Sequence, residues 1–103
     1  MYAITFDMDT TLLTELYPQA SYNNAYTDIG RFLQKYGFTR QQGSVYFGTE
    51  KVDAVTCVVA TQELAREYSW FSASVRDIRM LRIEDNNDLR PALNLMDARM
   101  GNK

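Results

Sequence analysis

Histidine is absent from this chain of 103 residues, and cysteine occurs only once. Histidine is the usual base beside a nucleophilic cysteine, so proton transfer here would have to come from carboxylates, tyrosine or water. The one cysteine, Cys57, lies in the apolar run 54–60, which favours a buried thiol over a nucleophile. A single cysteine also excludes a disulfide within the chain.

Long apolar segments and a strong charge of one sign are absent too. No stretch approaches membrane-spanning length, and the N-terminus lacks a basic segment followed by an apolar one, so we expect a cytoplasmic protein without a membrane partner. The net charge is -2, so any RNA binding must depend on a local group of arginines. At this length we expect one domain, residues 1–103, to which a partner subunit would add stability.

The clearest pattern in the chain is the alternation over residues 2–9. Apolar or aromatic side chains at even positions alternate with small or acidic ones at odd positions, which is typical of a strand with one buried face. Asp7 and Asp9 end this strand, and carboxylates there need water, a cation or a basic partner to stay ionised. We therefore expect the chemistry of the protein at this strand end.

Helical and extended patterns alternate along the rest of the core, which ends near residue 85. In order, they predict a loop with one helical turn (10–20), a helix with Ser21 as N-cap and Gly37 just beyond its end (21–36), a hairpin or one bent strand around Gly43-Ser44 (38–47), a second amphipathic helix (53–68), aromatic packing at its exit (70–71) and a last strand (75–84). The order βαββαβ predicts an α+β, ferredoxin-like fold with an antiparallel sheet and two helices on one face.

The C-terminal segment 86–103 follows this core. Residues 86–88 break the last strand, Pro91 is suited to open a short helix, and residues 100–103 are expected to fray. The methionine and leucine residues of the segment favour packing at a dimer interface over a membrane anchor. No internal repeat accompanies them.

Residues 6–13, Phe-Asp-Met-Asp-Thr-Thr-Leu-Leu, are similar to the first motif of haloacid-dehalogenase-type phosphatases, in which the first aspartate is the phosphoryl nucleophile. Thr10 stands where that motif has glycine. The phosphatase family also needs a doubly wound domain of about 150 residues or more. This chain is too short for that domain, so we interpret the motif as coincidental.

Five separated motifs resemble the virulence-associated protein D family, VapD. They are Met-Tyr-Ala-Ile-Thr-Phe-Asp (1–7), Tyr-Asn-Asn-Ala-Tyr (22–26), Gln-Gly-Ser-Val-Tyr (42–46), Trp-Phe (70–71) and Val-Arg-Asp-Ile-Arg (75–79). Members of this family are similar to the small ferredoxin-like nuclease subunit of CRISPR adaptation complexes, form homodimers and act as endoribonucleases that prefer purines. The resemblance implies an endoribonuclease acting on single-stranded or messenger RNA, and the toxin of a toxin–antitoxin pair with a small protein antitoxin.

The resemblance also implies that Asp7, Ser44 and Asp77 matter for cleavage. In the ferredoxin-like sheet order 4-1-3-2 these three residues lie at one end of the sheet. From the residues alone, the alternative role of each aspartate is a plain ion pair with a neighbouring arginine. The alternative role of Ser44, beside Gly43, is a place in an ordinary tight turn. Two carboxylates close together either share a proton or hold a divalent ion such as Mg²⁺, for which Asp7 is the candidate ligand. The sequence does not require a metal.

Arginines of the last predicted strand are candidates for binding the scissile phosphate, because a guanidinium matches phosphate oxygens in bidentate geometry. Alternation would place Arg76 on one face of the sheet and Arg79 on the other. Leu13 is a candidate RNA contact that shapes the loop over Asp7. Tyr46 is a candidate for stacking on an RNA base, with a place in the core as the more usual role of such a residue.

A catalytically inactive homodimer of the same fold, binding RNA or a protein, is the alternative function. The fold itself does not imply an activity. Cleavage by the purified chain would separate the two.

Overall fold

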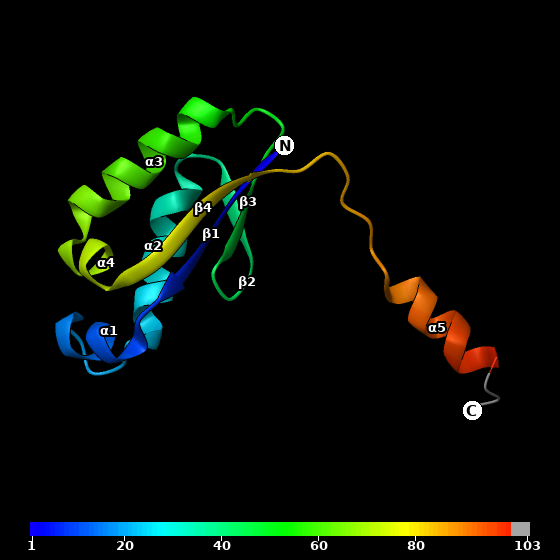
Figure 1. Ribbon diagram of the computed structural model, residues 1–103, viewed down its shortest axis with the longest axis horizontal. Helices are drawn as coiled ribbons and strands as arrows, with labels where there is room; N and C mark the ends of the chain where they lie inside the picture. Colours follow the sequence, from blue (N-terminus) through cyan, green and yellow to red (C-terminus); the bar gives the residue numbers. More distant parts are fainter. Residues whose placement is uncertain (100–103) are drawn as a thin grey trace.

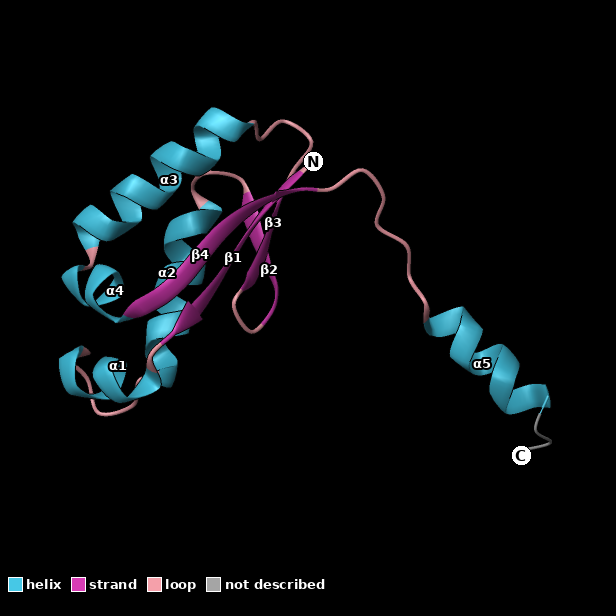
Figure 2. Cartoon of the chain, viewed as in Figure 1, coloured by secondary structure: helices cyan, strands magenta, loops and turns pink. Residues whose placement is uncertain are grey.

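A computed structural model describes residues 1–99 of the protein, so the predicted fraying of residues 100–103 lies outside the described part. The elements in chain order are β1 (Tyr2–Met8), α1 (Thr10–Leu16), α2 (Asn23–Gln34), β2 (Phe38–Gln42), β3 (Val45–Gly48), α3 (Ala54–Glu67), α4 (Ser69–Ser74), β4 (Val75–Arg82) and α5 (Arg90–Arg99). Figure 2 shows the strands gathered into one sheet with α2 and α3 beside it.

The four strands form an antiparallel sheet with the order β2-β3-β1-β4, which is the predicted order 4-1-3-2 counted from the other edge. The α+β fold with its four-stranded sheet is therefore confirmed. Segment 38–47 is a hairpin, the first of the two alternatives, and Gly43 supplies the turn with a positive φ of 50°. The central strand β1 pairs with β3 on one side and β4 on the other.

The alternation in β1 separates a buried face of the sheet from an open one. Its even-numbered residues Ile4, Phe6 and Met8 are buried and belong to the same core cluster as residues of α2 and α3. The odd positions face the other side of the sheet, where Asp7 is exposed, Thr5 is half-buried and the small Ala3 is buried between neighbouring strands. Aromatic rings dominate the buried side: Phe6 stacks on Tyr46 with ring centroids 5.7 Å apart.

Two short helices occupy places where the sequence predicted less order. Helix α1 fills the predicted loop, with Asp9 as its N-cap: the Asp9 carboxylate accepts a hydrogen bond from the Leu12 amide at 3.1 Å. Residues around Trp70 form α4 instead of simple aromatic packing. The two helices pack together beside the end of β1 and the start of β4 (Figure 1), and the Asp9 amide donates to the Ser74 carbonyl at 2.7 Å.

The predicted N-cap of the first long helix was one position too early. Helix α2 begins at Asn23, with Tyr22 in the N-cap position and no side-chain cap. Ser21 instead accepts a hydrogen bond from the Asn23 amide at 3.4 Å, which stabilises the preceding turn. Gly37 follows the helix as predicted, with a φ of 92°.

The C-terminal helix α5 stands away from the rest of the chain (Figure 1). Residues 83–89 have no helix or strand and connect it to β4. Three leucines of this part, Leu89, Leu93 and Leu95, are 74%, 61% and 63% exposed. No helix in residues 1–99 is long and apolar enough to cross a membrane.

We predict that Tyr46→Phe makes stability less sensitive to alkaline pH. Tyr46 has no exposed surface, and burial raises the pKa of its phenol to about 12. Below pH 10, the ordinary pKa of a tyrosine in the unfolded chain, the neutral phenol makes its full contribution to the free energy of unfolding. That contribution is lost as the pH rises from 10 to about 12. Urea denaturation should show about 1 kcal/mol more loss at pH 11, relative to pH 8, in the wild type than in the variant. Equal losses in both proteins would contradict the assignment.

Candidate active site

Asp7 and Asp77 are directly opposite each other in the β1–β4 ladder. The Cα atoms of directly opposed residues in antiparallel strands lie about 4.5–5.5 Å apart, and their side chains share one face. Both carboxylates are on the open face, and their side chains are 69% and 50% exposed. The predicted meeting of these two distant aspartates is confirmed by the geometry.

An arginine accompanies each carboxylate. The Arg76 Nε lies 3.8 Å from Asp7 Oδ2, a loose ion pair. Arg79 holds Asp77 more firmly, since its Nε donates to both carboxylate oxygens at 3.1 Å. These hydrogen bonds and the charge of Asp77 raise the pKa of Arg79 above its ordinary value, so the guanidinium stays charged.

The prediction that Arg76 and Arg79 lie on opposite faces was wrong. The register shifts between Asp7 and Met8, because Met8 pairs with Val75 while Asp7 pairs with Asp77. This bulge leaves Arg76 as an extra residue and interrupts the alternation, so its side chain reaches Asp7. A single-residue irregularity of this kind cannot be recognised from a period of two.

Ser44 lies at the same end of the sheet but contributes differently from the aspartates. Its carbonyl accepts a hydrogen bond from the Phe6 amide at 3.2 Å, which attaches the β2–β3 turn to the end of β1. Its hydroxyl lies near the phenol of Tyr26 on α2 and favours the ionised form of that phenol. Since Thr5 pairs with Val45, Ser44 stands opposite Phe6 in the β1–β3 register, so its side chain lies on the buried face, opposite to that of Asp7.

The sequence interpretation missed Tyr26 and Arg40 as part of this region. Burial raises the pKa of the Tyr26 phenol, and Tyr22 and the charge of Asp7 add to the rise, which the hydrogen bond with Ser44 opposes. The phenol is therefore protonated at neutral pH and can donate a hydrogen bond. The Arg40 guanidinium lies over its ring, 5.6 Å from the centroid. The spacing of Arg40 and Gly43 across a tight turn was the one available sequence clue.

Leu13 and Tyr46 were predicted RNA contacts, and the structure places both in the core. Each has 0% exposed surface. A side chain without exposed surface offers nothing to RNA, so both predictions are corrected: these residues pack beneath the sheet end. For Leu13 the reason is α1, which turns its side chain inward. Asp9 is likewise engaged as the N-cap of α1.

A metal at this site would depend mainly on the two aspartates. Among residues 1–95, whose side chains the structure describes, no group of three or more His, Cys, Asp or Glu residues is placed to hold a metal ion. A pair of carboxylates is nevertheless a donor set that suits Mg²⁺, which keeps several waters and takes one or two protein carboxylates. Asp7 and Asp77 would hold such an ion, and it would polarise a phosphate oxygen.

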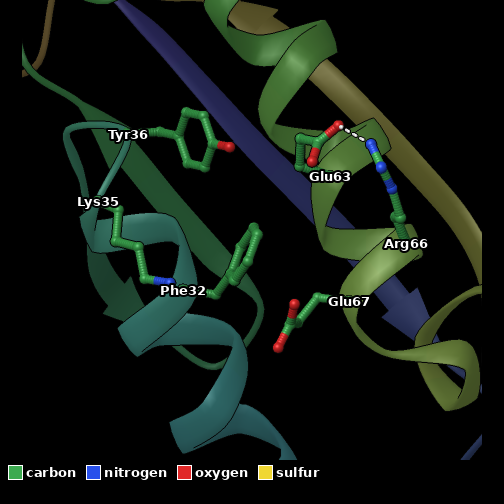
Figure 3. Close-up of a pocket in the computed structure, with 6 residues that line it drawn as sticks. All are labelled: Phe32, Lys35, Tyr36, Glu63, Arg66 and Glu67. Carbon is green, nitrogen blue, oxygen red and sulfur yellow. Dashed lines mark hydrogen bonds and ion pairs between the residues drawn. The ribbon is translucent and has the colours of Figure 1, made fainter.

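A pocket elsewhere has less suitable chemistry. It lies between α2 and α3 and is shown in Figure 3. Three of its four charged groups already interact with neighbours: Arg66 pairs with Glu63 at 3.3 Å, and the Lys35 ammonium lies 4.7 Å from the centroid of Phe32. The pocket contains neither Asp7 nor Asp77, so we locate the candidate active site at the sheet end.

Comparisons with known proteins show similarity along most of the chain. The family model of CRISPR associated protein Cas2 matches residues 1–90. Endoribonuclease VapD 2 of Riemerella anatipestifer is 53% identical over 93 residues, which cover 90% of this chain and 99% of that protein. An endoribonuclease VapD homolog of Helicobacter pylori is 49% identical over 96 residues, covering 93% and 99% of the two chains. The endoribonuclease VapD of Haemophilus influenzae is 42% identical over 88 residues, covering 85% and 92%.

The chain belongs to the VapD endoribonuclease family. Its VapD relatives match along nearly their whole length, and the Cas2 model spans every strand of the sheet. The predicted family and its ferredoxin-like, Cas2-type fold are thereby confirmed. For a VapD protein, the pair of exposed carboxylates at the strand end is the natural place to look for chemistry.

We predict that Asp77→Ala leaves the stability of this VapD protein almost unchanged. Exposed ion pairs contribute about 0–1 kcal/mol, and removing Asp77 also relieves its repulsion with Asp7. The matched control is Asp53→Ala, another exposed aspartate, whose carboxylate caps α3 by accepting from the Thr56 amide at 2.8 Å. Urea denaturation should show a change below about 0.5 kcal/mol for Asp77→Ala and a loss of about 1 kcal/mol for Asp53→Ala. A larger loss for Asp77→Ala would assign it a structural role.

Proposed function

We propose that this protein is an endoribonuclease that cleaves single-stranded RNA, including messenger RNA, in the cytoplasm. The observation that supports it best is the opposed pair Asp7 and Asp77 on an open sheet face, each beside an arginine. A phosphodiester needs a base for the attacking oxygen and positive charge for the phosphate. The exposed pair supplies the first and the two arginines supply the second.

Asp7 is the better general base of the two. Its contact with Arg76 is long, at 3.8 Å, whereas both oxygens of Asp77 are engaged by Arg79. Asp7 would take the proton of the attacking hydroxyl or water as the new P–O bond forms, while the P–O bond to the leaving oxygen breaks and that oxygen takes a proton from water. Arg76 and Arg79 would turn part of their donors to the phosphate oxygens, where negative charge increases during the reaction. Asp77 would orient Arg79 or, with a bound divalent ion, become its second ligand.

Ser44 and the Tyr26 phenol complete the proposed site on the other side of the sheet end. Tyr26 is a protonated donor and Ser44 carries a hydroxyl, so together they offer hydrogen bonds to an RNA strand that passes the rim. We propose that the cuts prefer purines, as the family resemblance implies. We also propose that the protein is the toxin of a pair with a small protein antitoxin.

A homodimer is the proposed working form. β4 is an edge strand of the sheet, and its residues Met80 and Leu81 are 45% and 47% exposed. The exposed leucines of α5 add a second apolar surface that the body of the same chain does not cover. A helix of about ten residues is marginal in water on its own, so a partner surface would stabilise it. We therefore propose that segment 86–103 packs at the interface of two copies.

The alternative function, RNA or protein binding without cleavage, uses the same surfaces. The exposed carboxylate pair distinguishes the two proposals. A polyanion gains nothing from two carboxylates at its contact surface, and they are explained by proton transfer or metal binding.

We predict that Asp7→Asn lowers RNA cleavage about 100-fold or more while the protein stays folded, because the general base is lost. Asp77→Asn should lower it less, and Asp53→Asn should not change it. Purified protein would be incubated with a defined RNA with and without EDTA, and the cut positions would be sequenced. Loss of cleavage with EDTA assigns a metal mechanism. Cuts without regard to purines would contradict the proposed preference.

The same variants test the toxin proposal in growing bacteria. Expression of the wild type should slow growth and expression of Asp7→Asn should not. Cleavage that survives unchanged in both aspartate variants would indicate a contaminating nuclease and leave the binding alternative. Equal growth with wild type and Asp7→Asn would contradict a toxin role.

We predict that shortening the chain to residues 1–85 shifts the dimer towards monomer. The shortened chain keeps all four strands and loses the apolar leucines of α5. Analytical ultracentrifugation over a range of concentrations would measure the dissociation constant. Leu93→Ser should weaken the dimer as well, whereas Val55→Ser, an apolar residue of α3 that is 69% exposed, is the control. An unchanged dissociation constant in both the shortened chain and Leu93→Ser would contradict a role of segment 86–103 in the dimer.

A further inference from the structure

Most arginines of the folded body already have an acidic partner. The ion pairs are Arg31 with Asp28, Arg66 with Glu63, Arg76 with Asp7, Arg79 with Asp77 and Arg82 with Glu84. Between residues 1 and 85, Arg40 is the one arginine without an ion pair to a carboxylate. Its positive charge is therefore not neutralised within this part of the chain.

Two neighbours hold the Arg40 side chain in place. Its Nε donates a hydrogen bond to the Gly43 carbonyl at 2.8 Å, and its guanidinium lies over the Tyr26 ring. That ring is stacked in turn on Phe6, with centroids 6.5 Å apart and planes within 7°. The planar guanidinium is thus oriented before any ligand arrives, which lowers the entropy lost on binding. The two terminal nitrogens keep their donors for a ligand.

The position of Arg40 connects it with the candidate active site. The turn that it contacts carries Ser44, whose carbonyl is bonded to the Phe6 amide beside Asp7. The two carboxylates and two guanidiniums on the open face cancel in charge. Arg40 is therefore the guanidinium near this end of the sheet that no carboxylate of residues 1–85 pairs with, and a polyanion requires an available positive charge.

We propose that Arg40, supported by Tyr26, is a phosphate-binding subsite for the RNA strand, next to the phosphate that reacts at Asp7. The inference depends on the proposed endoribonuclease function and names a contact within it. The fork of the guanidinium would bind two oxygens of a neighbouring phosphate. This contact would fix the position of the RNA strand along the sheet end without recognising a base, since phosphate contacts carry no sequence information.

The test compares Arg40→Gln and Arg40→Lys with the matched control Arg31→Gln, an exposed arginine of α2 that pairs with Asp28. Binding would be measured with a short single-stranded RNA in the Asp7→Asn background, so that the RNA stays intact, at several salt concentrations. Cleavage by each variant in the active background would give kcat and KM separately.

Arg40→Gln should raise Kd and KM about tenfold with little change in kcat, in line with the loss of one charge-assisted contact. The slope of log Kd against log salt should fall by about 0.7, the value for one phosphate contact on a single strand. Arg40→Lys should keep the slope and lose part of the affinity, because lysine keeps the positive charge but cannot form the bidentate hydrogen bonds of a guanidinium. Arg31→Gln should match the wild type.

An unchanged salt slope in Arg40→Gln would overturn the proposal. A lower melting temperature with that unchanged slope would assign Arg40 to the β2–β3 turn alone. Absence of cleavage by the wild type would refute the proposed function, while the salt slope would still report whether Arg40 binds a phosphate. The two failures are thus distinguishable.

Discussion

The antiparallel pairing of β1 with β4 is the constraint on which the rest of the site depends. It brings Asp7 and Asp77, which are 70 positions apart in the chain, to opposite positions on one face. The bulge beside this pair then directs Arg76 to Asp7, against the ordinary alternation of a strand. Two like charges in opposed positions are unfavourable for a sheet by a few tenths of a kcal/mol or more. Arg76 and Arg79 offset this repulsion, and the proposed function uses the pair.

The two faces of the sheet contribute in different ways. The buried face carries stacked and edge-on aromatic rings around Phe6, which hold α2, β3 and α4 against β1. The open face carries charge in place of packing. Arg40 and Ser44 approach the sheet end from the aromatic side, and the carboxylates from the open side. An extended RNA strand, unlike a small ligand, is long enough to contact both faces of the sheet at this end.

Most of the fold could be predicted from the sequence because its strongest patterns are local. The period of two in β1 and the helical spacing of α2 and α3 each bury one face, and a shift of register would expose it. Helices α1 and α4 were underestimated because each is short and depends on contact with the other for its stability. The N-cap of α2 differed by one residue, since Ser21 serves the turn before the helix.

The sequence by itself determined the family, the order of the elements and the identity of the acidic pair, because these follow from local periodicity and from motifs. Only the tertiary structure decided which side chains share a surface. It placed Leu13 and Tyr46 in the core, engaged Asp9 as a helix cap and moved Arg76 to the side of Asp7. It also left Arg40 with an uncancelled charge over an aromatic ring. The physical reason is that burial, ion pairing and bulges depend on neighbours from distant parts of the chain, which no local pattern records.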